Sequence, residues 1–150
     1  MSEQGHTSRQ DILEVAAVPA PSDVAQRLGL DEGQDVVMRR LRFVVDELPV
    51  QLVRVYYKTE LVAGSKLEQP VVIPDGVHAE LRRLGVRITR FIEDFMGARL
   101  PNPEERALQL PSGVPVTRNI RTAYAGDQPV EIMDTISHGE VVMHRFEIKL

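Results

Sequence analysis

Two arginines separated by a single residue are the sequence feature best suited to binding chemistry. Arg40 and Arg42 lie in the run Asp35–Val45, whose β-branched residues favour a strand, and a strand directs both side chains to the same face. Guanidinium groups hold carboxylates and phosphates with paired hydrogen bonds, so the pair predicts an anion-binding site. The alternative is a solvated sheet face on which the pair forms salt bridges with Glu131 or Asp134.

A second possible anion site lies at Asp75-Gly76. These residues open a predicted helix whose apolar positions are Val77, Leu81 and Leu84. Gly76 would let a ligand approach the free backbone N–H groups of the first turn. The alternative is an ordinary helix capped by Asp75.

The residues required by common catalytic sites are missing. The chain has no cysteine, which excludes a thiol nucleophile, an iron–sulfur cluster and a cysteine zinc site. Its four histidines lack metal-ligand spacing, and no nucleotide-binding or serine-hydrolase motif occurs. The acidic doublets fall at predicted turns and helix starts, where caps explain them. We therefore expect no catalytic residue, no metal and no cofactor.

Length and charge restrict the possible partners. The chain has 150 residues, enough for one domain with its own core, and its 22 acidic residues outnumber its 18 basic ones. DNA binding by this chain alone is not expected, because nucleic-acid binders carry a basic surface. No apolar run is long enough to cross a membrane. Residues 1–10 are polar, and we expect a disordered leader before a domain over residues 11–150.

Periodicity and turn residues predict an α+β fold. The expected product is a single antiparallel sheet of about six strands with short helices packed on it. Helices are expected at 22–28 and 75–84, and a short one starts at Asn102. Strands are expected at 11–18, 35–45, 50–57, 86–96, 115–124, 130–137 and 141–148.

The two halves of the chain resemble each other. Residues 21–50 align without gaps on residues 101–130, and both copies read as a short helix, a long strand, a turn, Pro-Val and a second strand. We interpret this as a pseudo-symmetric duplication inside one domain.

The ordered strings PSDVAQRLGLDEGQDVVMRRLRFVVDELPVQLVRVYY, GVHAELRRLGVRITRFIEDFM and GDQPVEIMDTI resemble the UTRA domain. This is the C-terminal effector-binding domain of HutC-type GntR transcriptional regulators, and the resemblance covers about residues 12–148. It implies a chorismate-lyase-like fold, a cytoplasmic homodimer and a small anionic metabolite that changes DNA affinity. In that family an N-terminal winged helix-turn-helix binds DNA, and this chain lacks one.

The resemblance also implies site residues. Arg40 and Arg42 match residues that hold the ligand's anionic group, Gly76 matches a phosphate contact, and Glu131 matches an acid that contacts ligand hydroxyls. Ser137 stands where sugar-phosphate-binding relatives carry an aromatic residue, which indicates a different anion. The candidate ligand-binding set is Arg40, Arg42, Gly76, His78, Arg90, Glu131 and Ser137. The alternative functions are a small chorismate-lyase-like enzyme and a dimerisation module without a ligand.

Overall fold

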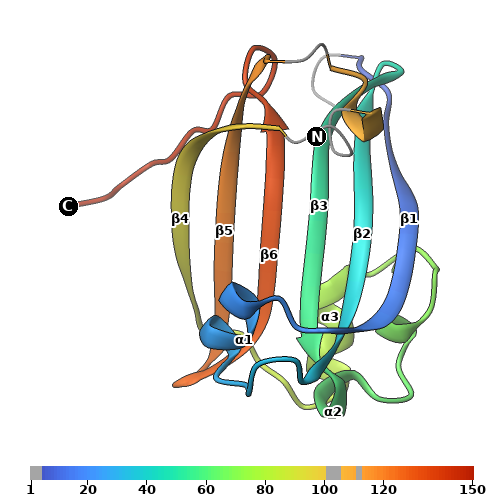
Figure 1. Cartoon of the computed structure of the whole chain (residues 1–150), viewed down its shortest axis with the longest axis vertical. Coiled ribbons are helices and arrows are strands. Elements are labelled where there is room, and N and C mark those ends of the chain that lie inside the picture. The colour runs from blue at the N-terminus through green and yellow to red at the C-terminus, as the bar shows by residue number, and fades with distance from the viewer. Residues whose placement is uncertain (1–4, 101–105, 111–112) are drawn as a thin grey trace.

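One antiparallel sheet forms the centre of the structure, a computed structural model that describes residues 5–100, 106–110 and 113–150 (Figure 1). Its strands follow the order β1-β2-β3-β6-β5-β4, and every neighbouring pair is antiparallel. The α+β prediction with six strands is therefore confirmed. The strands are β1 (Ser8–Pro19), β2 (Asp35–Val45), β3 (Leu48–Lys58), β4 (Arg90–Arg99), β5 (Pro115–Ala125) and β6 (Gln128–His138).

Short helices cover both faces of this sheet. They are α1 (Ser22–Leu28), α2 (Thr59–Val62), the 3-10 helix η1 (Lys66–Glu68) and α3 (Val77–Arg83); residues 106–108 are also helical. Gly29 ends α1 in the left-handed conformation, as its place after Leu28 predicts. Figure 1 shows α1 in front of the sheet and α3 behind it. We call these two faces the α1 side and the α3 side.

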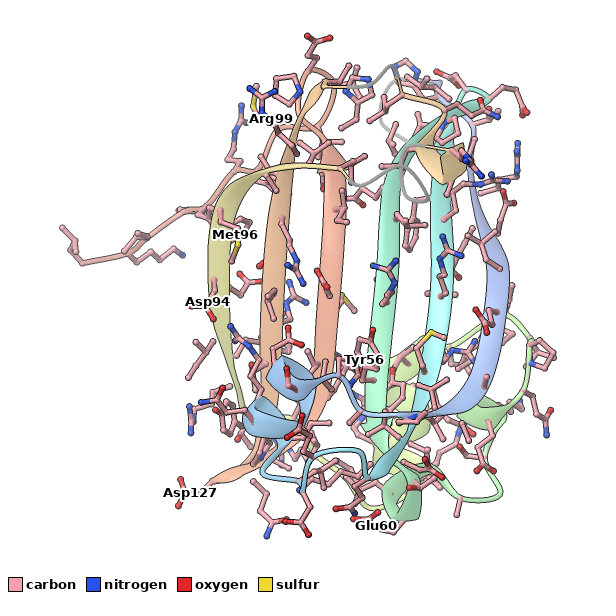
Figure 2. All side chains as sticks on the ribbon, viewed as in Figure 1. Tyr56, Glu60, Asp94, Met96, Arg99 and Asp127 are labelled. Atoms are coloured by element: carbon pink, nitrogen blue, oxygen red, sulfur yellow. The ribbon has the colours of Figure 1, made fainter. Side chains whose placement is uncertain are left out.

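Alternation along the strands divides the core between the two sides. On the α3 side, Leu41, Val55 and Tyr57 pack in one cluster with Leu81 of α3. On the α1 side, Val36, Met38 and Tyr56 pack with Val24 and Leu28 of α1, and Tyr56 is labelled in Figure 2. Neighbouring residues of β2 therefore serve different sides of the molecule.

The β2–β3 and β5–β6 hairpins repeat with a constant spacing of 80 residues along the chain. Asp35 begins β2 and Pro115 begins β5, 80 residues later, and Leu48 and Gln128 begin β3 and β6 with the same spacing. The pairing shifts at Phe43/Val44 in the first hairpin and at Ala123/Tyr124 in the second. This symmetry agrees with the aligned sequence segments, while their origin by duplication stays a prediction.

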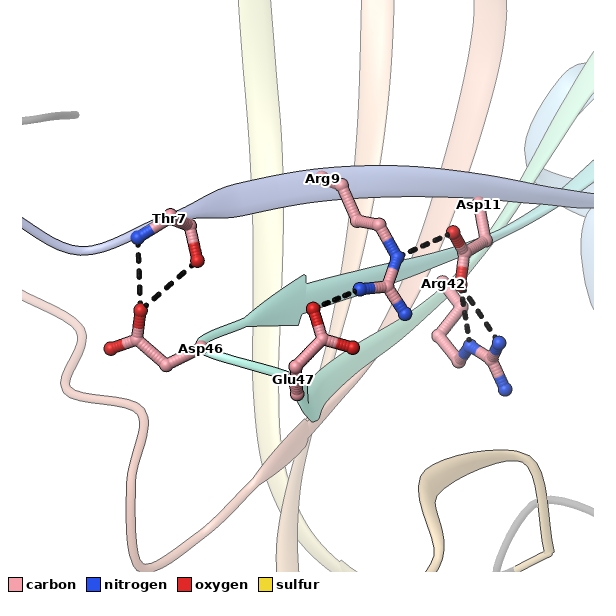
Figure 3. Close-up of polar contacts among 6 residues, drawn as sticks. All are labelled: Thr7, Arg9, Asp11, Arg42, Asp46 and Glu47. Carbon is pink, nitrogen blue, oxygen red and sulfur yellow. Dashed lines mark hydrogen bonds and ion pairs between the residues drawn. The ribbon is translucent and has the colours of Figure 1, made fainter.

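The N-terminal strand is longer than the sequence predicted. β1 begins at Ser8, so the last part of the expected leader belongs to the sheet, and residues 1–4 lie outside the described residues. The backbone N–H of Thr7 donates to Oδ1 of Asp46 at 2.9 Å in the β2–β3 turn (Figure 3). This bond and the pairing with β2 order a segment whose composition indicates a loose terminus.

Two other expected elements differ from the structure. β4 begins at Arg90 rather than at residue 86, and the strand predicted at 141–148 is wrong, since that segment is extended but pairs with no described strand. Its residues alternate as in a strand, but none of the strands in residues 5–100, 106–110 and 113–150 pairs with it. The helix expected from Asn102 begins outside the described residues. No helix in the described part of the chain has the length and apolarity needed to cross a membrane.

Candidate functional site

A cavity of about 430 Å³ opens on the α3 side of the sheet. Strand alternation supplies most of its wall, because odd-numbered residues of β2, β3, β5 and β6 point to this side. The described lining contains arginine, amide and hydroxyl side chains but no carboxylate. The lining residues are Gln10, Arg39, Leu41, Phe43, Gln51, Val53, Val55, Ile73, Gly76, Val77, Asn119, Arg121, Met133, Thr135 and His144.

Arg39 is the buried charge of this cavity, with 3% of its surface exposed. Its Nη1 donates to the backbone carbonyls of Leu67 at 2.9 Å and Gln69 at 2.7 Å, and its Nη2 donates to that of Val71 at 2.8 Å. Burial lowers the pKa of this guanidinium. All these acceptors are neutral, and no described carboxylate forms an ion pair with Arg39. The cavity is therefore bordered by a positive charge that is hydrogen-bonded but not neutralised.

The β5 part of the same sheet face carries further polar groups. Nε of Arg121 donates to Glu93 of β4 at 2.7 Å, so much of its charge is already balanced. Oδ1 of Asn119 is buried and has no hydrogen-bond partner among the described residues. A ligand that offers a donor at this wall would satisfy Asn119, since a buried acceptor without a partner costs free energy.

Glu131 and His78 come together at the α3 end of the sheet. Glu131 is fully buried, and its Oε1 lies 3.7 Å from Nε2 of His78, which stacks on Phe91. Neither carboxylate oxygen has a hydrogen-bond partner among the described residues, nor does the hydroxyl of Tyr57, the cross-strand neighbour of Glu131. Burial, assisted by the Glu131 charge, raises the pKa of Tyr57 well above its ordinary value.

Gly76 lines the cavity but not in the way the sequence predicted. Its φ of 82° and ψ of 158° belong to a region that glycine alone adopts readily. Its own N–H donates to the carbonyl of Ile73 at 3.0 Å, so that amide is not free for an anion. Asp75 does not cap α3; it pairs instead with Arg83 at 2.5 Å.

Arg40 and Arg42 lie on the other side of the sheet. Nη2 of Arg42 is 2.8 Å from Oδ2 of Asp11 (Figure 3), and Nε of Arg40 is buried without a described hydrogen-bond partner. Neither arginine lines the cavity. Strand alternation therefore separates Arg40 and Arg42 from Gly76, and the cavity brings only Gly76 to its wall. Anion binding by the pair on the α1 side stays a prediction.

The salt bridges considered as the alternative for Arg40 and Arg42 do not form either. Asp134 pairs with Arg118 at 2.7 Å, and Glu131 lies on the α3 side. Asp11, whose pKa is lowered chiefly by the hydrogen bonds from Arg42, takes that role instead. One member of the pair therefore has a structural role, because Arg42 of β2 forms an ion pair with Asp11 of β1.

The last two predicted residues do not line the cavity. The hydroxyl of Ser137 accepts a hydrogen bond from Nε2 of Gln51 at 2.9 Å, and Gln51 does line the cavity, so Ser137 positions a wall residue. Arg90 is exposed at the start of β4, where its guanidinium lies 3.8 Å from the centre of the Tyr124 ring.

Sequence reasoning missed Arg39, Asn119, Arg121 and His144. The signal for Arg39 was present, because alternation puts it on the same face as Leu41 and Phe43. An arginine on an otherwise apolar strand face must be hydrogen-bonded inside the fold, which makes Arg39 a better candidate than Arg40 and Arg42 on the other face.

The family can be decided from the sequence itself. The UTRA domain family model matches residues 3–142, most of the chain. The chain belongs to the UTRA domain family. It is also 34% identical over 120 residues to an HTH-type transcriptional regulator of Streptomyces coelicolor, a match that spans 77% of this chain and 44% of that protein. This chain thus matches less than half the length of that regulator.

Solved UTRA-type structures share the fold. The ligand-binding domain of a GntR-family regulator from Bordetella bronchiseptica superposes with a TM-score of 0.84 at 21% identity, covering 95% of this chain and 90% of that one. The C-terminal domain of the histidine utilization repressor from Pseudomonas syringae superposes with a TM-score of 0.78 at 23% identity. The match covers 97% of this chain and 98% of that one. The effector domain of PhnF from Mycobacterium smegmatis superposes with a TM-score of 0.77 at 20% identity. The match covers 94% of this chain and 90% of that one. The chain therefore has the fold of these ligand-binding and effector domains.

Proposed function

We propose that this UTRA domain is a cytoplasmic, homodimeric sensor that binds a small anionic metabolite in the cavity on the α3 side. The observation that supports this most strongly is the charge of Arg39, buried beside the cavity without a described carboxylate partner. A buried charge is costly unless an opposite charge compensates it. An anionic ligand would supply that compensation, so the cavity favours anions over neutral or cationic molecules.

The rest of the lining describes the ligand further. A volume of about 430 Å³ suits a small molecule. Leu41, Phe43 and Val53 of β2 and β3 offer an apolar surface, and Asn119 and Arg121 of β5 offer polar groups. The best match is a carboxylate or phosphate with an apolar body and at least one hydrogen-bond donor for Asn119.

Regulation would follow from preference of the ligand for one arrangement of the dimer. A coupling free energy of about 1–3 kcal/mol between the cavity and an attached DNA-binding domain is enough for a useful switch. The HTH-type relative of greater length supports the presence of such a domain in regulators of this kind. DNA contact would then be made by that domain and not by this one.

Two other functions are weaker candidates. A chorismate-lyase-like enzyme needs a poised acid or base, and the nearest described arrangement is the Glu131–His78 pair, which does not line the cavity. Release of pyruvate from chorismate would support that alternative. A dimerisation module without a ligand predicts that no small molecule changes the melting temperature.

The proposal is tested by screening small carboxylates and phosphates for a rise in melting temperature, followed by calorimetry. Arg39→Gln removes the charge, and Val53→Met lengthens a side chain that lines the cavity while Arg39 stays in place. Both variants should weaken binding of the best anion at least tenfold, by about 1.4 kcal/mol or more. Arg42→Gln, on the α1 side, is the matched control and should bind normally. Binding that survives Val53→Met but is lost in Arg42→Gln would overturn the proposal, as would a screen without any responding anion.

A further inference from the structure

The two halves of β1 are attached to the fold in different ways. The pairing of β1 with β2 shifts between Ile12 and Glu14, so an irregularity divides the strand. Beyond it, Val15 packs against the apolar cluster of the α3 side and Val18 against that of the α1 side. The second half of β1 is therefore anchored by the core.

Residues 6–10, which we call the strap, are attached by backbone pairing and by polar contacts at the surface (Figure 3). Nη1 of Arg9 donates to Oε1 of Glu47 at 2.7 Å, and the N–H and hydroxyl of Thr7 donate to Oδ1 of Asp46 at 2.9 and 3.2 Å. The side chains of Arg9 and Glu47 are 47% and 81% exposed. Exposed ion pairs contribute little stability, so the strap is the weakly held end of β1.

Gln10 connects the strap to the ligand cavity. It lies opposite Phe43 in the β1–β2 pairing, and both residues line the cavity. Gln10 is half-buried, and its side-chain amide makes no hydrogen bond with the described residues. A free amide offers two N–H donors and a carbonyl acceptor. A carboxylate or phosphate in the cavity would accept a hydrogen bond from this side chain, and that bond would tie the strap to the ligand.

We infer that Gln10 is a ligand contact and that an anion in the cavity holds the strap against β2. The inference rests on the proposed function, because it needs an occupied cavity. A segment held by few buried apolar contacts opens locally while the rest of the fold stays intact. A ligand that binds only the closed form shifts this equilibrium towards closure. Occupancy of the cavity therefore sets how firmly the N-terminal end of the sheet is ordered.

Amide hydrogen exchange of the whole chain, without ligand, tests whether the strap opens. Residues 7–10 should be protected at least tenfold less than residues 15–18 of the same strand. Asp46→Gly removes the bonds to Thr7, and glycine adopts the φ of 47° at this turn, so strap protection should fall at least threefold further. Asp127→Gly, in the exposed turn of the β5–β6 hairpin, is the matched control. Equal protection of both halves of β1, or a strap insensitive to Asp46→Gly, would overturn the strap.

The same measurement with the anion that gives the largest thermal shift tests the role of Gln10. At about 100 times its Kd, a ligand that binds only the closed form slows opening up to about 100-fold, so exchange of residues 7–10 should slow at least tenfold. Gln10→Ala, compared at the same multiple of its own Kd, should lose most of this slowing. Ser8→Ala is the matched control, because Ser8 is exposed on the same strand and does not line the cavity. Equal slowing in the wild type and in Gln10→Ala would overturn the role of Gln10.

These experiments separate a failure of this inference from a failure of the proposed function. If no anion binds, the proposed function and the ligand contact of Gln10 both fail, and the exchange measured without ligand still decides whether the strap opens. If an anion binds in the cavity and Gln10→Ala changes neither its affinity nor the exchange of the strap, this inference fails alone.

Discussion

Nη1 of Arg39 lies 2.9 Å from the backbone carbonyl of Leu67, and this bond joins the centre of the sheet to the loop that covers it. The same guanidinium also bonds the carbonyls of Gln69 and Val71. Arg39 therefore fixes the loop over the α3 side while its charge stays available to the cavity. Stability and binding are combined in one side chain, and variants must be chosen to separate them.

Arg39→Lys tests the structural half of this role. A lysine keeps the charge but cannot spread its donors over four backbone carbonyls as the planar guanidinium of Arg39 does. We expect the free energy of unfolding to fall by about 3 kcal/mol, because one or two charge-assisted hydrogen bonds are lost. Urea denaturation measures this. Arg82→Lys, at an exposed position of α3, should change little, and equal stability of both variants would contradict the role given to Arg39.

Gly76→Ala tests backbone strain at the cavity. A Cβ at this position would meet nothing within 4 Å, so only the φ of 82° opposes the change. We expect a loss of about 1–3 kcal/mol in the free energy of unfolding. Gly97→Ala is the matched control, because its Cβ would also meet open space and its φ is not positive. If the two alanine variants unfold at the same urea concentration, the strain argument fails.

Glu131→Gln should stabilise the fold. The carboxylate is fully buried and lacks hydrogen-bond partners among the described residues, a cost that natural proteins accept chiefly at functional sites. The neutral amide should raise the free energy of unfolding by about 1–3 kcal/mol. Thermal denaturation at about pH 8 measures the effect, with Glu140→Gln at an exposed position as the control. A destabilised Glu131→Gln protein would show that the charge is compensated in the fold.

Acid should weaken the link between β1 and β2. Hydrogen bonds from Arg42, and then from Arg9, lower the pKa of Asp11 below its ordinary 3.8. A carboxyl whose folded pKa is depressed stabilises the fold above its unfolded pKa, and this stabilisation is lost as the pH falls through the folded pKa. Arg42→Gln should therefore lose less stability than the wild type between about pH 6 and about pH 3. If the stability of Arg42→Gln depends on pH in the same way as that of the wild type, the Asp11–Arg42 ion pair does not contribute to acid stability.

Much of the fold follows from local patterns. The β2–β3 hairpin was predictable because strand-forming residues flank a turn at Asp46-Glu47, and both turn residues have positive φ, as tight hairpins require. The segment 141–148 has a strand-like pattern but pairs with no described strand. Alternation identifies a residue pattern that fits a strand, but it does not say which molecule supplies the neighbouring strand.

The site was harder to predict than the fold. Glu131, His78 and Gly76 lie on the α3 side, whereas Arg40 and Arg42, whose spacing predicts an anion site, lie on the α1 side. The buried position of Arg39 depends on the loop 66–71, which folds back over the sheet through contacts distant in sequence. Such a loop has no periodicity, so the sequence alone does not reveal what it covers.

A backbone amide NMR titration with the anion that gives the largest thermal shift tests the central claim most directly. If the cavity on the α3 side is the effector site, the largest shift changes will fall at Leu41, Val53 and Asn119, which line it. Shift changes centred on Arg40, Arg42 and Asp134, on the α1 side, would contradict the account.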